Sequence, residues 1–176
     1  MTAPEIQVTV LRATPSDRVV LDRLLALYLH DLSPHTGADL DEQGRFVYPF
    51  LDRYWTEAGR HAFLIRADGR LAGLALANTH VHLADSNWAM AEFFVARRYR
   101  RQGIGQRAAQ AIFAQLPGWW EVGVQASNTS AEAFWRAVLT AHTGHPPEAL
   151  HADTWAGLLF QFRQADRLQP PHRVPC

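Results

Sequence analysis

The fold is decided by residues 91–106, which read Ala91-Glu92-Phe93-Phe94-Val95-Ala96-Arg97-Arg98-Tyr99-Arg100-Arg101-Gln102-Gly103-Ile104-Gly105-Gln106. An apolar run typical of a strand leads into a turn that contains Gly103 and Gly105, and a helix is predicted to follow over residues 104–116. Glycine lets the backbone approach a ligand, and the free N–H groups at a helix start favour an anion. The stretch therefore predicts a phosphate-binding turn, with Arg100 and Arg101 adding positive charge.

A glycine pair before a helix can also be a turn without a ligand, and the two arginines favour the phosphate interpretation. Other phosphate-binding patterns fit poorly. A P-loop needs a Gly-Lys-Ser/Thr sequence, which is missing, and a dinucleotide fingerprint needs a third glycine and a place early in the chain.

The run Arg100-Arg101-Gln102-Gly103-Ile104-Gly105 resembles the pyrophosphate loop of the GNAT acetyltransferase family, Arg/Gln-x-x-Gly-x-Gly/Ala. The segment Phe93-Phe94-Val95 is similar to the end of the family's splayed fourth strand. Asn128, with Trp135 seven residues later, stands where the family has Asn and Tyr. The resemblance covers residues 5–162 and implies an α/β fold, a mixed, mostly antiparallel central sheet flanked by helices.

The remaining elements follow from hydrophobic periodicity and from turn residues. Strands are predicted over residues 6–12, 61–67, 71–77, 88–95, 119–125 and 154–162, and the dipeptide Asp68-Gly69 predicts a hairpin. Helices are predicted from Thr14-Pro15-Ser16-Asp17 to a break at Ser33-Pro34 and Gly37, and over residues 46–56, 104–116 and 130–139. We expect one acetyltransferase domain over residues 1–162 and a loosely ordered tail over residues 163–176.

The resemblance implies acetyl-coenzyme A as the acyl donor, with its pantetheine arm along the backbone of Phe94 and Val95 and its pyrophosphate on the loop. The residues expected to bind it are Phe93, Phe94, Val95, Arg100, Arg101, Gln102, Gly103, Ile104, Gly105, Gln106, Asn128 and Trp135. Asn128 can also cap the helix that follows it, because asparagine is a favoured N-cap residue.

Glu92 is the candidate catalytic base, because an amine must lose a proton to attack a thioester. Strand alternation predicts that it shares a face with Phe94, opposite Phe93 and Val95. The alternative is a buried glutamate bonded to a neighbouring strand. Glu121 is the second candidate, since the family's other base position falls on Gly123.

Trp135 occupies the place of the family's general acid, but an indole N–H does not act as an acid near neutral pH. Packing in the core is the other interpretation of this residue. The expected function is transfer of an acetyl group to a primary amine, of a small molecule, by direct attack. The alternative is a catalytically weak acyl-coenzyme A sensor of the same fold.

Tyr28, Tyr54 and Trp55 are expected to bind the acceptor. The acidic residues of the same region indicate a small cationic amine, with a solvated acidic loop as the alternative interpretation: Asp31, Asp39, Asp41 and Glu42.

The overall composition excludes several other classes of protein. Seventeen Lys and Arg balance 17 Asp and Glu, so neither nucleic acid nor an anionic membrane is an expected partner. The one cysteine is Cys176, and neither a leader nor a membrane-spanning run is recognisable, so we expect a cytoplasmic protein. His80 and His82 are two residues apart, and alternate residues that face solvent explain this spacing, so no metal is expected. A homodimer is left open.

Overall fold

The computed structural model describes residues 5–165. In chain order its elements are β1 (Val8–Arg12), the 3-10 turn η1 (Pro15–Asp17), α1 (Arg18–Thr36), α2 (Arg53–Thr56), β2 (Arg60–Ala67), β3 (Arg70–Asn78), β4 (Trp88–Val95), the 3-10 turn η2 (Arg97–Tyr99), α3 (Ile104–Phe113), β5 (Gly118–Gln125), α4 (Thr129–Thr143), β6 (Leu150–Ala152) and β7 (Trp155–Gln164).

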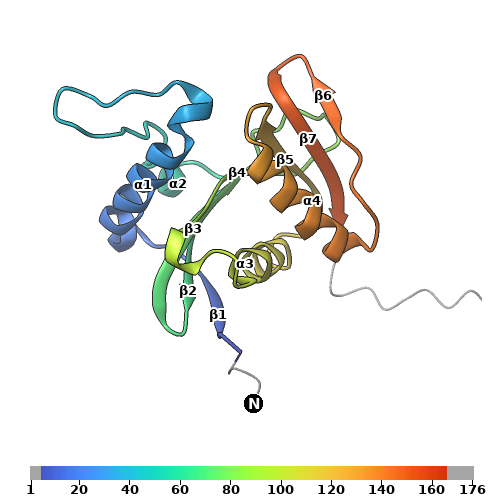
Figure 1. Ribbon diagram of the computed structural model, residues 1–176, viewed down its shortest axis with the longest axis horizontal. Coiled ribbons are helices and arrows are strands. Elements are labelled where there is room, and N and C mark those ends of the chain that lie inside the picture. Colours follow the sequence, from blue (N-terminus) through green and yellow to red (C-terminus); the bar gives the residue numbers. More distant parts are fainter. Residues whose placement is uncertain (1–4, 166–176) are drawn as a thin grey trace, which may run out of the picture.

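The strands form one sheet in the order β1-β2-β3-β4-β5-β7-β6. Neighbouring strands are antiparallel except β4 and β5, which are parallel. The mixed, mostly antiparallel sheet predicted from the sequence is therefore confirmed, with helices packed against it (Figure 1).

The parallel pair β4–β5 is joined only at its start. Trp88, Ala89 and Met90 pair with residues 120–122, and beyond Met90 the register between the two strands ends. The last residues of β4 keep β3 on one side, where Val95 still pairs with Gly73. A strand edge is thus left facing the gap between β4 and β5.

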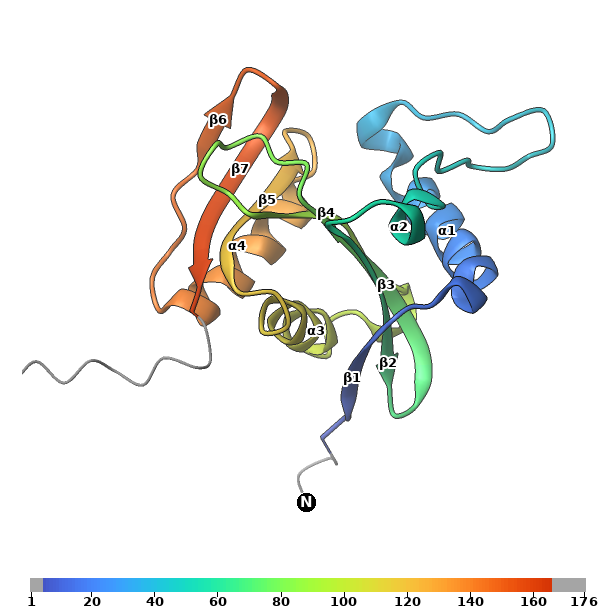
Figure 2. The same cartoon turned by 180° about the vertical axis from the view of Figure 1, so that it is seen from behind.

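Two hydrophobic layers cover opposite faces of the sheet. Leu21 and Leu25 of α1 pack with Phe94 of β4 on one face. On the other face, Ile104 of α3 packs with Ile65, and α4 covers β5 and β7. Figure 2 shows the same arrangement from behind, with α1 and α2 on one side of β2 and β3 and with α3 on the other. The gap in the sheet consequently lies between α1 on one side and α3 and α4 on the other.

A β-bulge in β4 decides which side chain faces which layer. Leu76 pairs with Glu92 and Ala77 with Met90, so Ala91 has no partner of its own on β3. Met90 packs in the layer beneath α3 and α4, whereas Ala91 packs in the α1 layer. The extra residue resets the alternation, so that Glu92 joins the α1 side instead of the opposite core.

The hairpin and the strand over residues 88–95 are present as predicted. The prediction of one helix is largely wrong. Asp68 and Gly69 both have positive φ, 47° and 74°, as a tight hairpin turn requires. The helix predicted over residues 46–56 shrinks to α2. Pro49 has no N–H, and Arg53 and Tyr54 donate to Phe50 and Leu51 in turns three residues long.

Other differences concern element ends. The short strand β6 was not predicted, and α1 continues through Pro34 to Thr36 before Gly37 ends it at φ 69°. The strand β7 runs to Gln164, two residues into the predicted tail, because Gln164 pairs with Gly118. The rest of that tail, residues 166–176, lies outside the described residues. Within residues 5–165, no helix has both the length and the hydrophobicity needed to cross a bilayer.

Candidate active site

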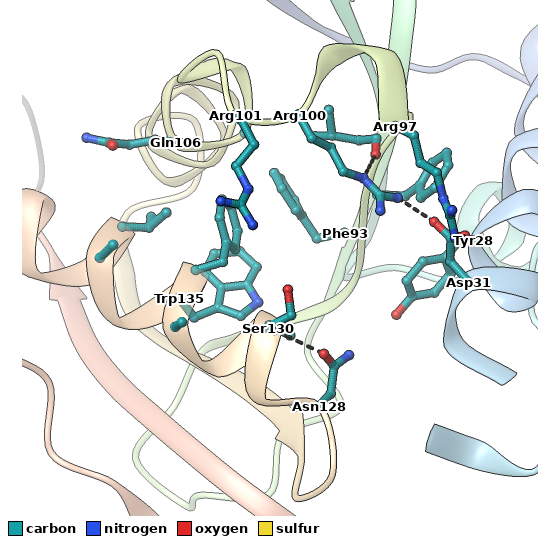
Figure 3. Close-up of a pocket in the computed structure, with 18 of the residues that line it drawn as sticks. Tyr28, Asp31, Phe93, Arg97, Arg100, Arg101, Gln106, Asn128, Ser130 and Trp135 are labelled. Atoms are coloured by element: carbon teal, nitrogen blue, oxygen red, sulfur yellow. Dashed lines mark hydrogen bonds and ion pairs between the residues drawn. The ribbon is translucent and has the colours of Figure 1, made fainter. Parts of the chain in front are cut away.

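A cleft of about 730 Å³ opens where β4 and β5 separate. Its walls come from α1, from the end of β4 with the loop to α3, and from the start of α4 (Figure 3). The lining residues are Tyr28, Asp31, Leu32, His35, Phe93, Phe94, Val95, Arg97, Arg100, Arg101, Gly103, Gly105, Gln106, Asn128, Ser130, Ala131, Ala133, Phe134, Trp135, Ala137 and Val138.

The loop at one end of this cleft has the geometry of an anion site. Gly103 is the N-cap of α3 with φ 71°, and its hydrogen atom in place of a side chain leaves the helix uncapped. The N–H groups of the first helical turn therefore have no partner within the helix. Arg101 adopts the left-handed conformation as well, with φ 61°, and Figure 3 shows its guanidinium pointing into the cleft while Gln106 points away.

Arg107, which was not among the residues predicted from the sequence, holds this loop from behind. Its Nη1 donates to Ile6 O at 2.6 Å, and its Nη2 donates to Gln102 O at 3.2 Å. The guanidinium thus ties the loop to the residues before β1. An arginine four residues after the N-cap glycine was a usable signal, because residues four apart lie on one helical face.

The two glycines of the motif have different roles. A side chain at Gly103 would meet no atom closer than 3.9 Å, but its positive φ is costly for other residues. At Gly105 a Cβ would lie 3.0 Å from the Phe134 ring. Gly105 therefore allows α3 to pack closely against Phe134.

Not every predicted loop residue reaches the cleft. Ile104 is fully buried in the core beneath α3, and the Gln102 amide donates to Arg98 O at 2.7 Å. Arg100 lines the cleft but is already engaged, since its Nε donates to Val95 O at 2.6 Å and its Nη2 pairs with Asp31. Arg101 is the loop arginine whose guanidinium is directed into the cleft.

The backbone N–H and C=O groups at the end of β4 point alternately toward β3 and toward the gap between β4 and β5. Ala96 N donates to Ala72 O, so antiparallel alternation assigns the ladder bonds with β3 to Ala96 and Phe94. The peptide groups of Phe93 and Val95 then face the gap. The free peptide groups beside the gap are therefore those of Phe93 and not those of Phe94, and the Val95 carbonyl accepts from Arg100 Nε.

The start of α4 forms the opposite end of the cleft. Asn128 caps the helix, because its Oδ1 accepts from Ala131 N at 3.0 Å, and it also lines the cleft. Trp135 is 6% exposed and packs edge-on against Phe93 and Phe134, which stack on each other at 5.7 Å between centroids. Trp135 is thus part of an aromatic floor.

Glu92 lies among tyrosines and does not itself line the cleft. Burial raises its pKa to about 7, although hydrogen bonding from Tyr28 and Tyr48 acts in the opposite direction. Burial, reinforced by the Glu92 charge, raises the pKa of Tyr28 well above its ordinary value. Tyr28 lines the cleft, so its side chain connects the cleft with the carboxylate. Tyr48 lies in the loop before α2, within residues 46–56 that were predicted to be helical, so its approach to Glu92 was not anticipated.

Glu121, the second candidate base, has a structural role. It is 1% exposed, and its two carboxylate oxygens accept from His82 N at 2.7 Å and from Leu83 N at 2.9 Å. The carboxylate therefore fixes the loop between β3 and β4, away from the residues that line the cleft.

The expected acceptor residues separate into two groups. Tyr28 lines the cleft, whereas Tyr54 is buried and its hydroxyl accepts from Asn78 Nδ2 at 3.2 Å. Trp55 packs beside it in the α1 layer, and its buried Nε1 has no hydrogen-bond partner among residues 5–165. Neither Tyr54 nor Trp55 lines the cleft.

Two of the four acidic residues behind the cationic-acceptor hypothesis are paired. Burial raises the pKa of Asp31, but hydrogen bonds from Arg100 and Arg97 outweigh it and hold the pKa below its ordinary value. Asp41 pairs with Arg45 at 3.1 Å. Asp31 and Asp41 are therefore not free to bind a cationic substrate.

Helix α1 contacts both lips of the cleft. Asp31 pairs with Arg97 at 2.9 Å on the loop after β4, and His35 Nδ1 lies 3.0 Å from Ser127 Oγ on the turn before α4.

No group of three or more potential metal ligands occurs among residues 5–165. The two histidines that are two residues apart have other partners, since His80 contacts Arg60 and His82 contacts Thr154.

Comparisons with known proteins agree with this geometry. The sequence profile of the acetyltransferase (GNAT) family matches residues 23–139. No curated protein sequence matches the chain significantly.

Solved structures with the same fold share little sequence. An acetyltransferase from Thermus thermophilus superposes with a TM-score of 0.65 at 18% identity, over 91% of this chain and 99% of that one. The aminoglycoside acetyltransferase meta-AAC0020 from an uncultured soil metagenomic sample, in complex with trehalose, gives 0.56 at 14% identity, over 82% and 93%. RimL, a ribosomal L7/L12 alpha-N-protein acetyltransferase in complex with coenzyme A, gives 0.58 at 12% identity, over 89% and 93%.

Proposed function

The chain belongs to the GNAT acetyltransferase family, and from that premise we propose that it moves an acetyl group from acetyl-coenzyme A to a primary amine of a small molecule. The amine attacks the thioester directly. One observation carries the proposal: Glu92, a carboxylate with a pKa of about 7, lies behind Tyr28 at a cleft that also contains the uncapped start of α3. A base with a pKa near the working pH is the most effective at that pH.

The cleft fits the acyl donor at several points. The free N–H groups at the start of α3, the left-handed Gly103 and the Arg101 guanidinium would hold the pyrophosphate. The gap-facing peptide groups of Phe93 would pair with the pantetheine arm. When bound, the donor supplies an activated thioester carbonyl. Arg100 departs from this set, because Asp31 and Val95 O already occupy its guanidinium.

Glu92 accepts the proton that the amine loses. Free alkyl amines are mostly protonated at neutral pH, so the acceptor needs a base before it can attack. The Tyr28 hydroxyl lies between the cleft and Glu92 and would relay this proton. Tyr48 and Tyr54 complete the surroundings of the carboxylate and restrict access to it.

A small acceptor is supported by this restricted access. The carboxylate lies behind side chains of α1 and of the loop over residues 37–52, so an amine on a slender molecule reaches Tyr28 more easily than one on a folded protein surface. Asp31 and Asp41 are each paired with an arginine, which weakens the argument for a strongly cationic acceptor. The charge of the acceptor is therefore a variable for experiment.

The test is release of free thiol from acetyl-coenzyme A with a panel of amines. The panel contains sisomicin, spermidine, phenethylamine and a peptide with a free N-terminus, each compared with a no-amine control. Faster thiol release with a small amine supports the proposal. Release only with the peptide contradicts the small-molecule acceptor.

The panel also separates an enzyme from a sensor. Trp135 in the aromatic floor provides no acid, which is the observation that favours a weakly catalytic acyl-coenzyme A sensor. Coenzyme binding in calorimetry without thiol release from any amine would establish the sensor instead.

A further inference from the structure

His35 is placed at the far end of the cleft from the phosphate loop. It lines the cleft, and its Nδ1 lies 3.0 Å from the Oγ of Ser127, the residue before Asn128. Figure 3 shows Arg100 and Arg101 at one end of the cleft and Asn128 with Ser130 at the other. With its pyrophosphate at the start of α3, a donor would extend along the cleft toward the Asn128 end. His35 would then lie at the end that receives the thioester.

The cleft wall contains few groups that can give up a proton near neutral pH. Within residues 5–165, its titratable lining residues are Tyr28, Asp31, His35, Arg97, Arg100 and Arg101. Burial raises the pKa of Tyr28, and arginine side chains stay charged. Asp31 is held ionised by Arg100 and Arg97, which keep its pKa low. An imidazole can donate a proton through a ring N–H, and in the described part of the cleft wall His35 supplies one.

We propose that His35 is the general acid that protonates the departing coenzyme A thiolate, the role that Trp135 cannot fill. The inference rests on the proposed acetyl transfer. As the amine nitrogen bonds to the carbonyl carbon, its proton passes to Glu92. The carbon–sulfur bond then breaks, the electron pair leaves with sulfur, and His35 Nε2–H gives its proton to that sulfur. Exchange with water afterwards removes the proton from Glu92 and restores the one on His35.

Ser127 orients the acid for this step. With Nδ1–H donating to Ser127 Oγ, the ring is held in place in both of its protonation states, and Nε2 is the nitrogen that exchanges the proton. The other titratable groups that line the same cleft are Tyr28 and Asp31 on α1 and Arg97, Arg100 and Arg101 on the loop after β4. Ser127 is therefore a positioning residue and His35 a catalytic one.

The first test compares His35→Gln with His30→Gln. His30 lies on the same helix, is largely exposed and is absent from the cleft lining. With the fastest amine of the panel, His35→Gln should lower kcat by about 10²- to 10⁴-fold and leave the coenzyme A affinity unchanged, while His30→Gln should match the parent protein. Equal kcat in all three proteins overturns the proposal, as does a loss of coenzyme affinity that accounts for the whole effect.

Two further readouts separate proton transfer from a structural role. The parent kcat should fall on the alkaline side as the acid loses its proton, and this limb should be missing in His35→Gln. Added imidazole should restore part of the His35→Ala rate, while pyrazole, which has the same size but is a much weaker base, should not. Rescue by both compounds, or an unchanged alkaline limb, contradicts an acid at this position.

A third measurement does not depend on turnover. In protein with ¹⁵N-labelled histidine, adding coenzyme A should shift the His35 imidazole signals and leave the His30 signals in place. Coenzyme binding in calorimetry without any His35 shift overturns the inference while the proposed function stands. Absence of coenzyme binding overturns both.

Discussion

The two faces of β4 beyond its bulge have different kinds of surroundings. Phe93 faces an apolar floor, where it packs against Phe134 and Trp135 and the start of α3 brings free N–H groups to the same cleft. Glu92, one residue earlier, faces Tyr28 and Tyr48 on the α1 side. We assign donor binding to the Phe93 face and proton transfer to the Glu92 face.

Affinity and turnover should therefore be separable by substitution. The Phe93 face is built from segments close in the sequence and relies on backbone geometry. The Glu92 face gathers side chains from β4, α1 and the loop before α2. A change on one face should leave the property of the other face intact, and the following experiments test this separation.

The largest effect is expected for Glu92→Gln. Glutamine keeps the size of the side chain but cannot accept the amine's proton, so kcat should fall by about 10²- to 10⁴-fold while coenzyme A affinity is retained. Steady-state kinetics and calorimetry measure the two quantities. The control is Glu148→Gln, at a position away from the cleft lining. A matching loss of coenzyme affinity would break the separation of the two faces.

The same variant should gain stability at neutral and alkaline pH. The pKa of Glu92 is raised from 4.5 to about 7, so folding favours its protonated form. The contribution of protonated Glu92 to the free energy of unfolding is fully present below pH 4.5 and is lost as the pH rises through about 7. Above that pH, Glu92→Gln should be more stable than the parent by at most about 3 kcal/mol, with no difference near the acid end of this range. Urea unfolding across this pH range measures the free energy of unfolding.

Gly103→Val should weaken coenzyme A binding by at least about tenfold. A β-branched residue at φ 71° is strained by about 1 to 3 kcal/mol, and that strain falls on the loop whose N–H groups face the anion. Gly44→Val is the control, since Gly44 has φ 72° and equally open surroundings in a loop outside the cleft lining. Both variants should lose similar stability, and full coenzyme affinity in Gly103→Val would disprove the loop assignment.

Arg101→Asn should have the smallest effect, roughly a fivefold to tenfold loss of coenzyme A affinity that shrinks as salt is added. Asparagine tolerates the left-handed backbone at φ 61°, so the charge is removed without added strain. Arg98→Asn removes the same charge from the outer side of the loop, where the side chain is exposed and does not line the cleft. Calorimetry at two salt concentrations should distinguish the two arginines, and equal losses would indicate a diffuse charge effect.

The parts that could be predicted from the sequence are the local ones. The backbone conformations of Gly103 and of the Asp68-Gly69 turn were predictable because few other residues accept positive φ. The assignment of Arg100 to phosphate failed to anticipate Asp31, a residue 69 positions earlier in the chain that pairs with its guanidinium.

The surroundings of Glu92 could not be predicted either, because they also depend on contacts between segments that lie far apart in the sequence. Tyr48 reaches the carboxylate from a loop in which Pro49 breaks the apparent helical periodicity. His35 and Ser127 meet across 92 positions, and hydrophobic patterns do not report polar contacts between such distant segments. Glu121 was the second candidate base from the sequence, and only its two backbone donors reveal its structural role.

The bulge in β4 also determines how relatives of this chain must be compared. Ala91 is an extra residue on β4. Relative to β3, the positions before Ala91 are therefore shifted by one residue from the positions after it. A relative without the bulge, aligned from Trp88 onward without a gap, would have the wrong residue matched to Glu92. Counting backward from Val95, where the pairing with Gly73 is regular, avoids this error. Positions equivalent to Glu92 are therefore best counted back from Val95 and not forward from the strand's beginning.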